Sequence, residues 1–304
     1  MNTILVGVDA SEHAQDAIAF ANRIARASCA RVVVACGFHD NGRERRRENH
    51  DERSVLRDEA EFIARRMSRR LHDIDVSRVH TRSYLTTAPD HGLSELAVSE
   101  GVALIIVGTS RAGSLGDALP GGTGARLLHE GACAVAVVPR GYLAHAERPF
   151  RRIGVGYDGT SESRSALVAA VAAVHAFGAD LQVLAVLSAQ AFTVSSVRPS
   201  GPGYFDFDDD FRDEASDQLD AVVASLPISA EGIILDGRPA HQLALRSKHL
   251  DLLVVGSRGY DALHAALGGG VSGLVLRDTC CPVIAVPPGI EAPLAFLSGE
   301  RRHA

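Results

Sequence analysis

The sequence predicts an α/β protein built from two tandem, doubly wound, parallel five-stranded sheets. Short apolar runs alternate with segments whose apolar residues recur at helical spacing, which is typical of a parallel sheet covered by helices on both faces. The whole pattern occurs twice along the 304 residues, so that Asp158 follows Asp9 by 149 residues and Gly256 follows Gly108 by 148. A repeat this long indicates two similar domains and not a solenoid. We place these domains at residues 1–140 and 151–289.

Each half opens with a buried strand that ends at an aspartate, Asp9 in the first half and Asp158 in the second. An alanine-containing segment with apolar residues on one face follows each aspartate and predicts a helix. In the first half we expect this helix at residues 13–27, with Ser11 as its N-cap. Each aspartate can accept hydrogen bonds from a ligand, or it can simply cap the helix that follows.

The remaining strands follow in the same order in both halves. We expect them at Arg31–Cys36, Val79–Leu85, Ala103–Val107 and Cys133–Val138 in the first half, and at Leu181–Leu187, Glu231–Leu235, Leu252–Val255 and Cys281–Val286 in the second. Helices restart at Pro89 and Pro239. Arg140–Arg151 is the expected linker between the domains.

A polar, poorly patterned stretch follows the second strand of each half. His39–Arg53 is rich in arginine, and Ser195–Asp213 is rich in aspartate. The aspartates of the second stretch suit either a divalent metal or a solvated loop, and the arginines of the first suit either an acidic partner or an exposed helix start. The candidates are Asp206, Asp208, Asp209, Asp210, Arg43, Arg45, Arg46 and Arg47. Because the two stretches are equivalent in the repeat and opposite in charge, contact between them is a hypothesis.

A glycine-lined loop follows the fourth strand of the second half. Gly256 and Gly259 flank its start, Gly268–Gly270 form its end, and a helix begins directly afterwards. Glycine lets backbone amides approach an anion, and a helix N-terminus favours negative charge. Ligands of open α/β sheets bind at the carboxyl ends of strands. We therefore expect ribose at Asp158, phosphates at the loop and adenine near Val186, which together make a nucleotide site.

These residues resemble the universal stress protein family, with two UspA-type domains that cover nearly all of residues 2–140 and 151–288. The family signature is Gly, two residues, Gly, nine residues, Gly, then Ser or Thr. It is matched here by Gly256, Gly259 and Gly269, with Ser272 shortly after. The aspartate after the first strand also matches. Members that resemble this pattern bind ATP, so the resemblance implies ATP, with or without Mg²⁺, as the ligand.

The two halves depart from the signature to different degrees. In the second half, Gly270 stands where nucleotide-binding members have Ser or Thr, and Ser272 remains. In the first half, Arg111 replaces the second glycine, and Thr123 restores a hydroxyl only if one residue is inserted. The first-half candidates are Asp9, Gly108, Gly121, Gly122 and Thr123. The second half is therefore the better candidate for the nucleotide site.

Composition and charge narrow the classes of function. A net charge of −6 argues against a nucleic-acid partner, since phosphate backbones require a basic face. No run of 18 apolar residues and no signal peptide is visible, and the five cysteines lack framework spacing. Thirteen histidines show no ligand spacing, so no metal site is expected. We expect a cytoplasmic protein with reduced thiols and no membrane partner.

Two classes of function follow. The first is a stress-response regulatory module that binds ATP, and the alternative is a scaffold without nucleotide that acts through its dimer surface. An enzyme is not expected, because no P-loop and no nucleophile–base pair is present and neither loop contains lysine; at most, ATP hydrolysis would be slow and incidental. The resemblance further implies that the fifth strands pair edge to edge within one chain, and that tandem chains form a homodimer.

Overall fold

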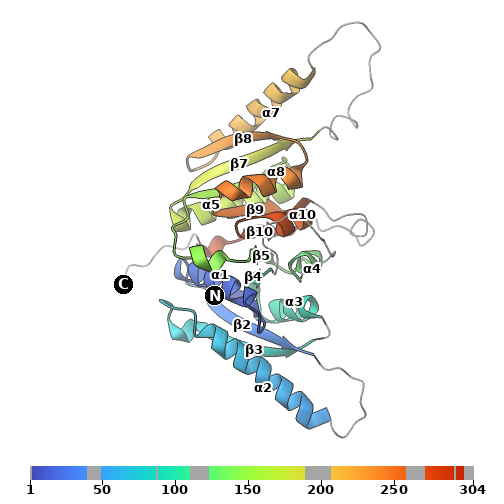
Figure 1. The fold of residues 1–304 in the computed structure, drawn as a ribbon. Helices are drawn as coiled ribbons and strands as arrows, with labels where there is room; N and C mark the ends of the chain where they lie inside the picture. The colour runs from blue at the N-terminus through green and yellow to red at the C-terminus, as the bar shows by residue number, and fades with distance from the viewer. Residues whose placement is uncertain are drawn as a thin grey trace.

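The strands of both halves join into one continuous sheet (Figure 1). A computed structural model describes residues 2–39, 49–86, 88–109, 123–188, 207–257, 271–290 and 292–297. Within these residues the strands are β1 (Thr3–Val8), β2 (Arg31–Phe38), β3 (Val79–Leu85), β4 (Val102–Gly108), β5 (Ala134–Val138), β6 (Arg152–Gly156), β7 (Asp180–Leu187), β8 (Ala230–Asp236), β9 (Leu252–Gly256) and β10 (Val283–Val286). Their order across the sheet is β3-β2-β1-β4-β5-β10-β9-β6-β7-β8.

Pairing is parallel within each half and antiparallel only where the halves meet. Val135 of β5 pairs with Ala285 of β10, and Val137 pairs with Val283. Each half thus keeps the predicted doubly wound order of five parallel strands. The expected pairing of the fifth strands within the chain is also confirmed, and it turns two five-stranded sheets into a single sheet.

Helices cover both faces of the sheet. The principal helices are α1 (His13–Arg26), α2 (Asn49–Ser68), α3 (Pro89–Glu100), α4 (Thr123–Glu130), α5 (Ser161–Phe177), α7 (Phe207–Ala224), α8 (Pro239–Arg246) and α10 (Val271–Asp278). One core cluster packs α1, α2, α5 and α7 on one face, and a second packs α3, α4, α8 and α10 on the other. Both clusters continue from one half into the other, so the two domains share their cores.

The linker between the domains is docked against α1 and includes a short 3-10 helix, η2 (Tyr142–His145). The buried Asp16 carboxylate of α1 accepts hydrogen bonds from the amides of Gly141 (3.0 Å) and Leu143 (2.8 Å). Phe20 packs edge-on against Tyr142, with ring centroids 5.7 Å apart. Aromatic pairs of this kind contribute about 0.5–1.5 kcal/mol beyond their buried area.

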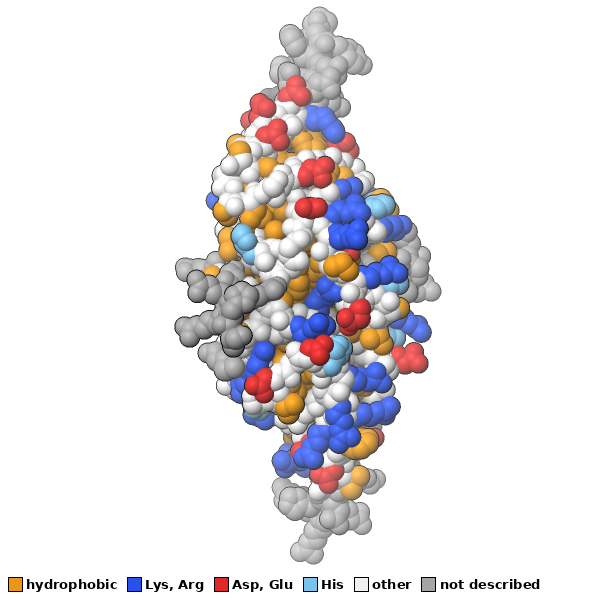
Figure 2. All heavy atoms as spheres, turned by 90° about the vertical axis from the view of Figure 1, so that its left-hand side faces the viewer, with side chains coloured by type: hydrophobic (Ala, Val, Ile, Leu, Met, Phe, Trp, Pro, Cys, Tyr) orange, Lys and Arg blue, Asp and Glu red, His pale blue; other side chains and the backbone are white. Residues whose placement is uncertain are grey.

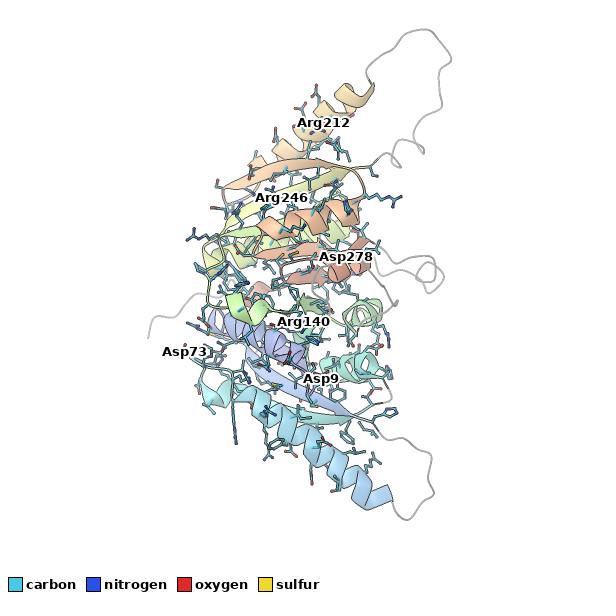
Figure 3. The ribbon with its side chains drawn as sticks, in the orientation of Figure 1. Asp9, Asp73, Arg140, Arg212, Arg246 and Asp278 are labelled. Atoms are coloured by element: carbon cyan, nitrogen blue, oxygen red, sulfur yellow. The ribbon has the colours of Figure 1, made fainter. Side chains whose placement is uncertain are left out.

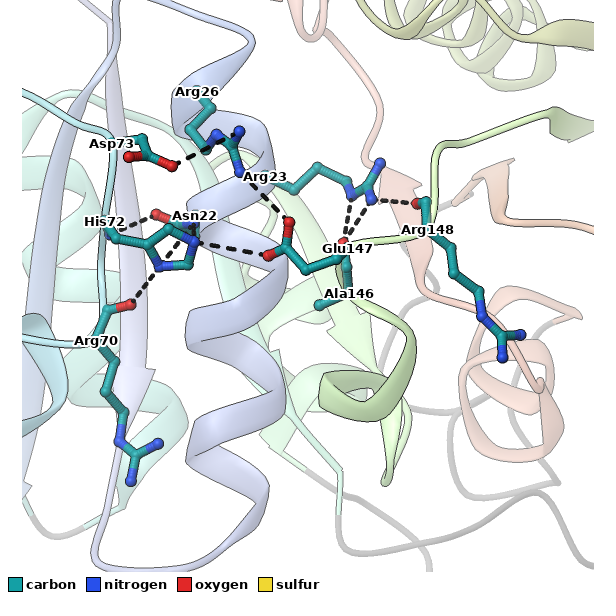
Figure 4. Close-up of polar contacts among 9 residues, drawn as sticks. All are labelled: Asn22, Arg23, Arg26, Arg70, His72, Asp73, Ala146, Glu147 and Arg148. Carbon is teal, nitrogen blue, oxygen red and sulfur yellow. Dashed lines mark hydrogen bonds and ion pairs between the residues drawn. The ribbon is translucent and has the colours of Figure 1, made fainter.

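Polar contacts hold the second part of the linker (Figure 4). The Arg23 guanidinium donates to the carbonyls of Ala146 and Arg148 and lies 4.3 Å from the centroid of the Phe150 ring. The Glu147 carboxylate forms an ion pair with the Arg26 guanidinium at 3.6 Å. The linker is therefore a structured bridge and not a free tether.

Two local expectations are wrong. The N-cap of α1 is Glu12 and not Ser11, because the Ser11 hydroxyl donates to Asp9 instead. The last part of each polar stretch is helical, since α2 begins at Asn49 and α7 at Phe207. Residues 208–210 thus start a helix instead of forming a loop; Asp206 and the four arginines from Arg43 to Arg47 lie outside the described residues.

The α2 and α7 helices lie at opposite ends of the molecule (Figure 1). In Figure 2, basic side chains gather over the half that carries α2, and acidic ones lie at the far end near α7. The described parts of the two charged stretches therefore do not meet within one chain. Across the described residues, no helix has both the length and the apolar character that a membrane span needs.

Candidate functional site

The carboxyl ends of three neighbouring strands, β9, β6 and β7, lie side by side in the second half. β9 ends at Gly256, β6 is followed by Asp158, and Val186 lies near the end of β7. The Tyr157 amide donates to the Leu184 carbonyl at 2.9 Å, which holds the chain just before Asp158 against β7. The strand order thus brings together the three described residues that the sequence nominates for ribose, base and phosphate.

The carboxylate of Asp158 is positioned by a tight turn. Its Oδ1 accepts from the Thr160 amide (3.2 Å) and the Thr160 hydroxyl (2.6 Å), and Gly159 adopts φ 78°. Asp9 makes the same turn with Ser11, at 2.9 Å and 2.5 Å. The N-cap of α5 is Thr160, so neither aspartate caps a helix. Both exposed carboxylates are fixed at a strand end (Figure 3 labels Asp9).

Close packing by itself requires glycine at the end of the fourth strand of each half. A Cβ added at Gly256 would lie 2.5 Å from the backbone carbonyl carbon of Glu162 in α5. At Gly108 it would lie 2.2 Å from the backbone oxygen of His13 in α1. These two glycines therefore let the first turn of a helix rest directly on a strand end, whether or not a ligand is present.

The helix that follows the glycine-rich stretch differs between the halves. Ser272 is the second residue of α10 and is only 7% exposed. Thr123 is the first residue of α4 and is half-buried. The first-half counterpart of Ser272 is Gly124, where a Cβ would lie 2.4 Å from a methyl group of Val137. The first half thus has no room for a hydroxyl at that position.

The glycines that complete each loop lie outside the described residues. They are Gly259, Gly269 and Gly270 in the second half, and Gly121 and Gly122 in the first, together with Arg111. Their contact with phosphate stays a prediction.

The apolar end of the second strand also differs between the halves. Val186 pairs in register with Leu235 of β8, whereas its counterpart Gly37 pairs with Tyr84 of β3. A Cβ on Gly37 would lie 3.0–3.1 Å from the Tyr84 ring, so the aromatic ring covers this position. Sequence reasoning missed Tyr84, although aligning the halves would have shown a glycine facing a large side chain where two aliphatic residues face each other in the second half.

An ion pair lies beside the first-half site. Asp90 of α3 is 8% exposed and accepts from Arg126 of α4 at 3.4 Å. The corresponding residues of α8 and α10 are Ala240 and Leu274. Burial raises the pKa of the nearby Cys36 thiol to about 11, and the Asp9 and Glu59 carboxylates add to the rise. The first-half site thus has a charged pair where the second half has two apolar side chains. Among the described residues, no cluster of three metal-ligating side chains occurs.

The fold and the strand-end geometry define the class: a tandem α/β protein in which each half presents an aspartate at the switch point of its sheet. The model of the universal stress protein family matches residues 1–139 and 149–287. The chain therefore belongs to the universal stress protein family, with two family domains in tandem.

Individual relatives agree with this assignment. The universal stress protein YxiE of Bacillus subtilis is 32% identical over 148 residues, which are 45% of this chain and 99% of that protein. A Mycolicibacterium smegmatis universal stress protein is 29% identical over 198 residues, which span 62% of this chain but only 63% of that relative. The crystal structure of a universal stress protein from Archaeoglobus fulgidus superposes with a TM-score of 0.68 at 16% identity, covering 94% and 96% of the two chains; this likeness shows the fold.

Proposed function

We propose that the protein binds an adenine nucleotide, ATP with or without Mg²⁺, at the carboxyl ends of β9, β6 and β7, and that it acts as a cytoplasmic stress-response regulator and not as an enzyme. Nucleotide occupancy would shift the balance between conformations or partners, because a ligand favours the state to which it binds more tightly. The first domain takes no nucleotide in this proposal.

The observation that carries the proposal is the arrangement at the second-half strand ends. The Asp158 carboxylate is fixed by Thr160 beside a half-buried apolar surface formed by Val186 and Leu235. A ribose hydroxyl donates well to such a carboxylate, and a planar base packs against aliphatic side chains. The side-chain hydroxyl of Ser272 and the N-terminal amides of α10 supply donors to phosphate on the neighbouring helix.

A calorimetric titration with ATP tests this proposal. We expect one ATP per chain, and Asp158→Ala is expected to weaken affinity at least about 10-fold, since a hydrogen bond to a charged group contributes about 1.5–3 kcal/mol. Asp9→Ala is the matched control, because Asp9 makes the same turn in the first half. ATP at 100 times its Kd should stabilise the fold by about 2.7 kcal/mol.

Two results would contradict the nucleotide proposal. One is an unchanged unfolding midpoint of the wild type in millimolar ATP. The other is an equal loss of affinity in the Asp9 and Asp158 variants, which would leave the second half with no special role.

The second candidate function is a scaffold without nucleotide. The Tyr84 ring, which covers the Gly37 position, favours this candidate, because a first half without a base-binding position would act through its outer surface alone. β5 and β10 each have neighbours on both sides, so a homodimer of tandem chains would use other surfaces. Sedimentation with and without ATP separates the candidates: an ATP-independent dimer with no ATP bound supports the scaffold.

A further inference from the structure

We propose that Tyr84 fills the base position of the first domain, so that this crevice is closed by the chain itself and opens to an adenine ring only when Tyr84 is made smaller. The inference rests on the proposed function, because the base position of the first half is defined as the equivalent of Val186 in the second half. It assigns to a single aromatic residue the difference in nucleotide capacity between two halves of the same fold.

The register of the strands places Tyr84 at that position. Thr3 pairs with Arg31 in the first half, and the equivalent Arg152 pairs with Asp180 in the second. Continuing along both strands makes Gly37 the counterpart of Val186. Tyr84 lies opposite Gly37, as Leu235 lies opposite Val186. Both pairs pack on the same face of the sheet, the face covered by α3 and α4 or by α8 and α10.

A slot formed by two glycines holds the ring. A Cβ on Gly37 would lie 3.0 Å from the ring carbon Cζ, and a Cβ on Gly92 of α3 would lie 2.5 Å from Cε2. The counterparts in the second half are Val186 and Gln242, both of which have side chains. The two halves thus differ at three neighbouring positions. The first half has glycine at two of them and tyrosine at the third, where the second half has valine, glutamine and leucine. Such compensation indicates a ring that is built into the crevice and does not rest loosely over it.

The surroundings of the Tyr84 hydroxyl are those of a half-buried side chain close to the site. Burial raises the pKa of Tyr84, and the nearby Cys36 thiol and the Asp90 and Asp9 carboxylates raise it further. Asp9 is the first-half counterpart of the proposed ribose ligand, and its carboxylate is close enough to contribute to the raised pKa of Tyr84. A nucleotide would have to displace a large, half-buried side chain from its packing, and this lowers its affinity for the first crevice by about 100-fold.

Binding stoichiometry tests the inference, with adenosine and ATP as separate probes. Adenosine reports on the base and ribose positions without the phosphate loop. We expect one site per chain in the wild type and a second site in Tyr84→Ala and in Tyr84→Leu, where leucine is the residue that the second half carries. Tyr84→Phe keeps the ring and should stay at one site. Circular dichroism establishes that each variant is folded.

The outcomes separate this inference from the proposed nucleotide function. If the wild type binds neither probe but Tyr84→Leu gains one site, the proposed function fails and the role of Tyr84 stands. If folded Tyr84→Ala and Tyr84→Leu gain no site, the inference is wrong. It is equally wrong if the wild type itself binds two adenosines per chain, a measurement that needs no variant.

Discussion

At the scale of single residues, the same amino acid serves different purposes in one structure. Gly256 and Gly108 are required because a helix backbone lies directly against each strand end. Gly273, inside α10, has open space around the position of a Cβ. The sequence marks all three as glycines of a glycine-rich region, and only the packing separates them.

Alanine substitution should therefore have opposite effects at Gly256 and Gly273. Gly256→Ala is expected to destabilise the protein by about 1–3 kcal/mol, because the strand and the α5 backbone must move apart. Gly273→Ala is expected to stabilise it by about 0.5–1 kcal/mol, because alanine is the better helix former. Urea midpoints measure both. Equal effects at the two positions would contradict this account of Gly256.

The residues of the candidate site were predictable only in part. Asp9 and Asp158 are identifiable because an aspartate directly after an apolar strand must lie at the carboxyl edge of a parallel sheet. Tyr84 is harder to identify, because it faces Gly37 on the neighbouring strand β2 and Gly92 on α3, and recognising this requires the two halves to be aligned and the register of β2 with β3 to be known. The glycines that complete each loop still rest on the sequence alone.

At the scale of elements, the strands follow the sequence closely, and β3 has the expected ends, Val79 and Leu85. Runs that are buried on both faces have a strong apolar signal. The sequence predicts α2 only as one of two alternatives, an exposed helix start, and does not predict α7, because the patterns of both helices are weak. On α2, Val55 and Phe62 are 64% and 65% exposed, so apolar residues occupy the face that should be polar. Boundaries of this kind depend on tertiary packing and not on periodicity.

One charged contact links three elements and should make stability depend on pH. Glu100 ends α3 and accepts from Arg31 of β2 (2.5 Å) and Arg82 of β3 (3.0 Å). Burial acts to raise the pKa of the Glu100 carboxyl, but the two arginines outweigh it and the pKa lies below its usual range. A carboxyl whose pKa is lower in the folded state stabilises the fold above its unfolded pKa of about 4.3 and loses that contribution as pH falls.

Glu100→Gln is therefore expected to cost about 1–3 kcal/mol at pH 7 and to lose less stability than the wild type between about pH 5 and pH 3. Unfolding free energies measured by urea across that range provide the check. Glu95→Gln on the same helix is the control, since the Glu95 side chain is 69% exposed. If the unfolding free energy of Glu100→Gln falls as steeply with decreasing pH as that of the wild type, the Glu100 carboxyl is not the cause of the pH dependence.

At the scale of the whole molecule, the two domains are fastened by three means. β5 pairs with β10, both core clusters cross from half to half, and the linker is anchored to α1 through Asp16. The duplication and the linker range are visible in the sequence. The docking of the linker is not, because it depends on contacts such as Arg23 with Phe150 that join distant segments.

The shared cores predict that both domains unfold together. Multidomain proteins commonly unfold in several steps, but here neither half can lose its sheet without exposing the β5 or β10 edge of the other. Scanning calorimetry should give one peak, with equal calorimetric and van't Hoff enthalpies. Two resolved peaks, or an enthalpy ratio near two, would show that the halves are independent.

The β5–β10 seam also bears on how the two halves can diverge. When two domains belong to one polypeptide, each molecule contains one copy of each domain, and the two sequences can differ. In a homodimer of identical subunits, every residue is present twice, so the two sites cannot differ in sequence. One domain can then lose ligand binding and serve only as a structural support, while the other domain keeps its site. With one site per chain, each molecule would be either occupied or empty, with no partly occupied state.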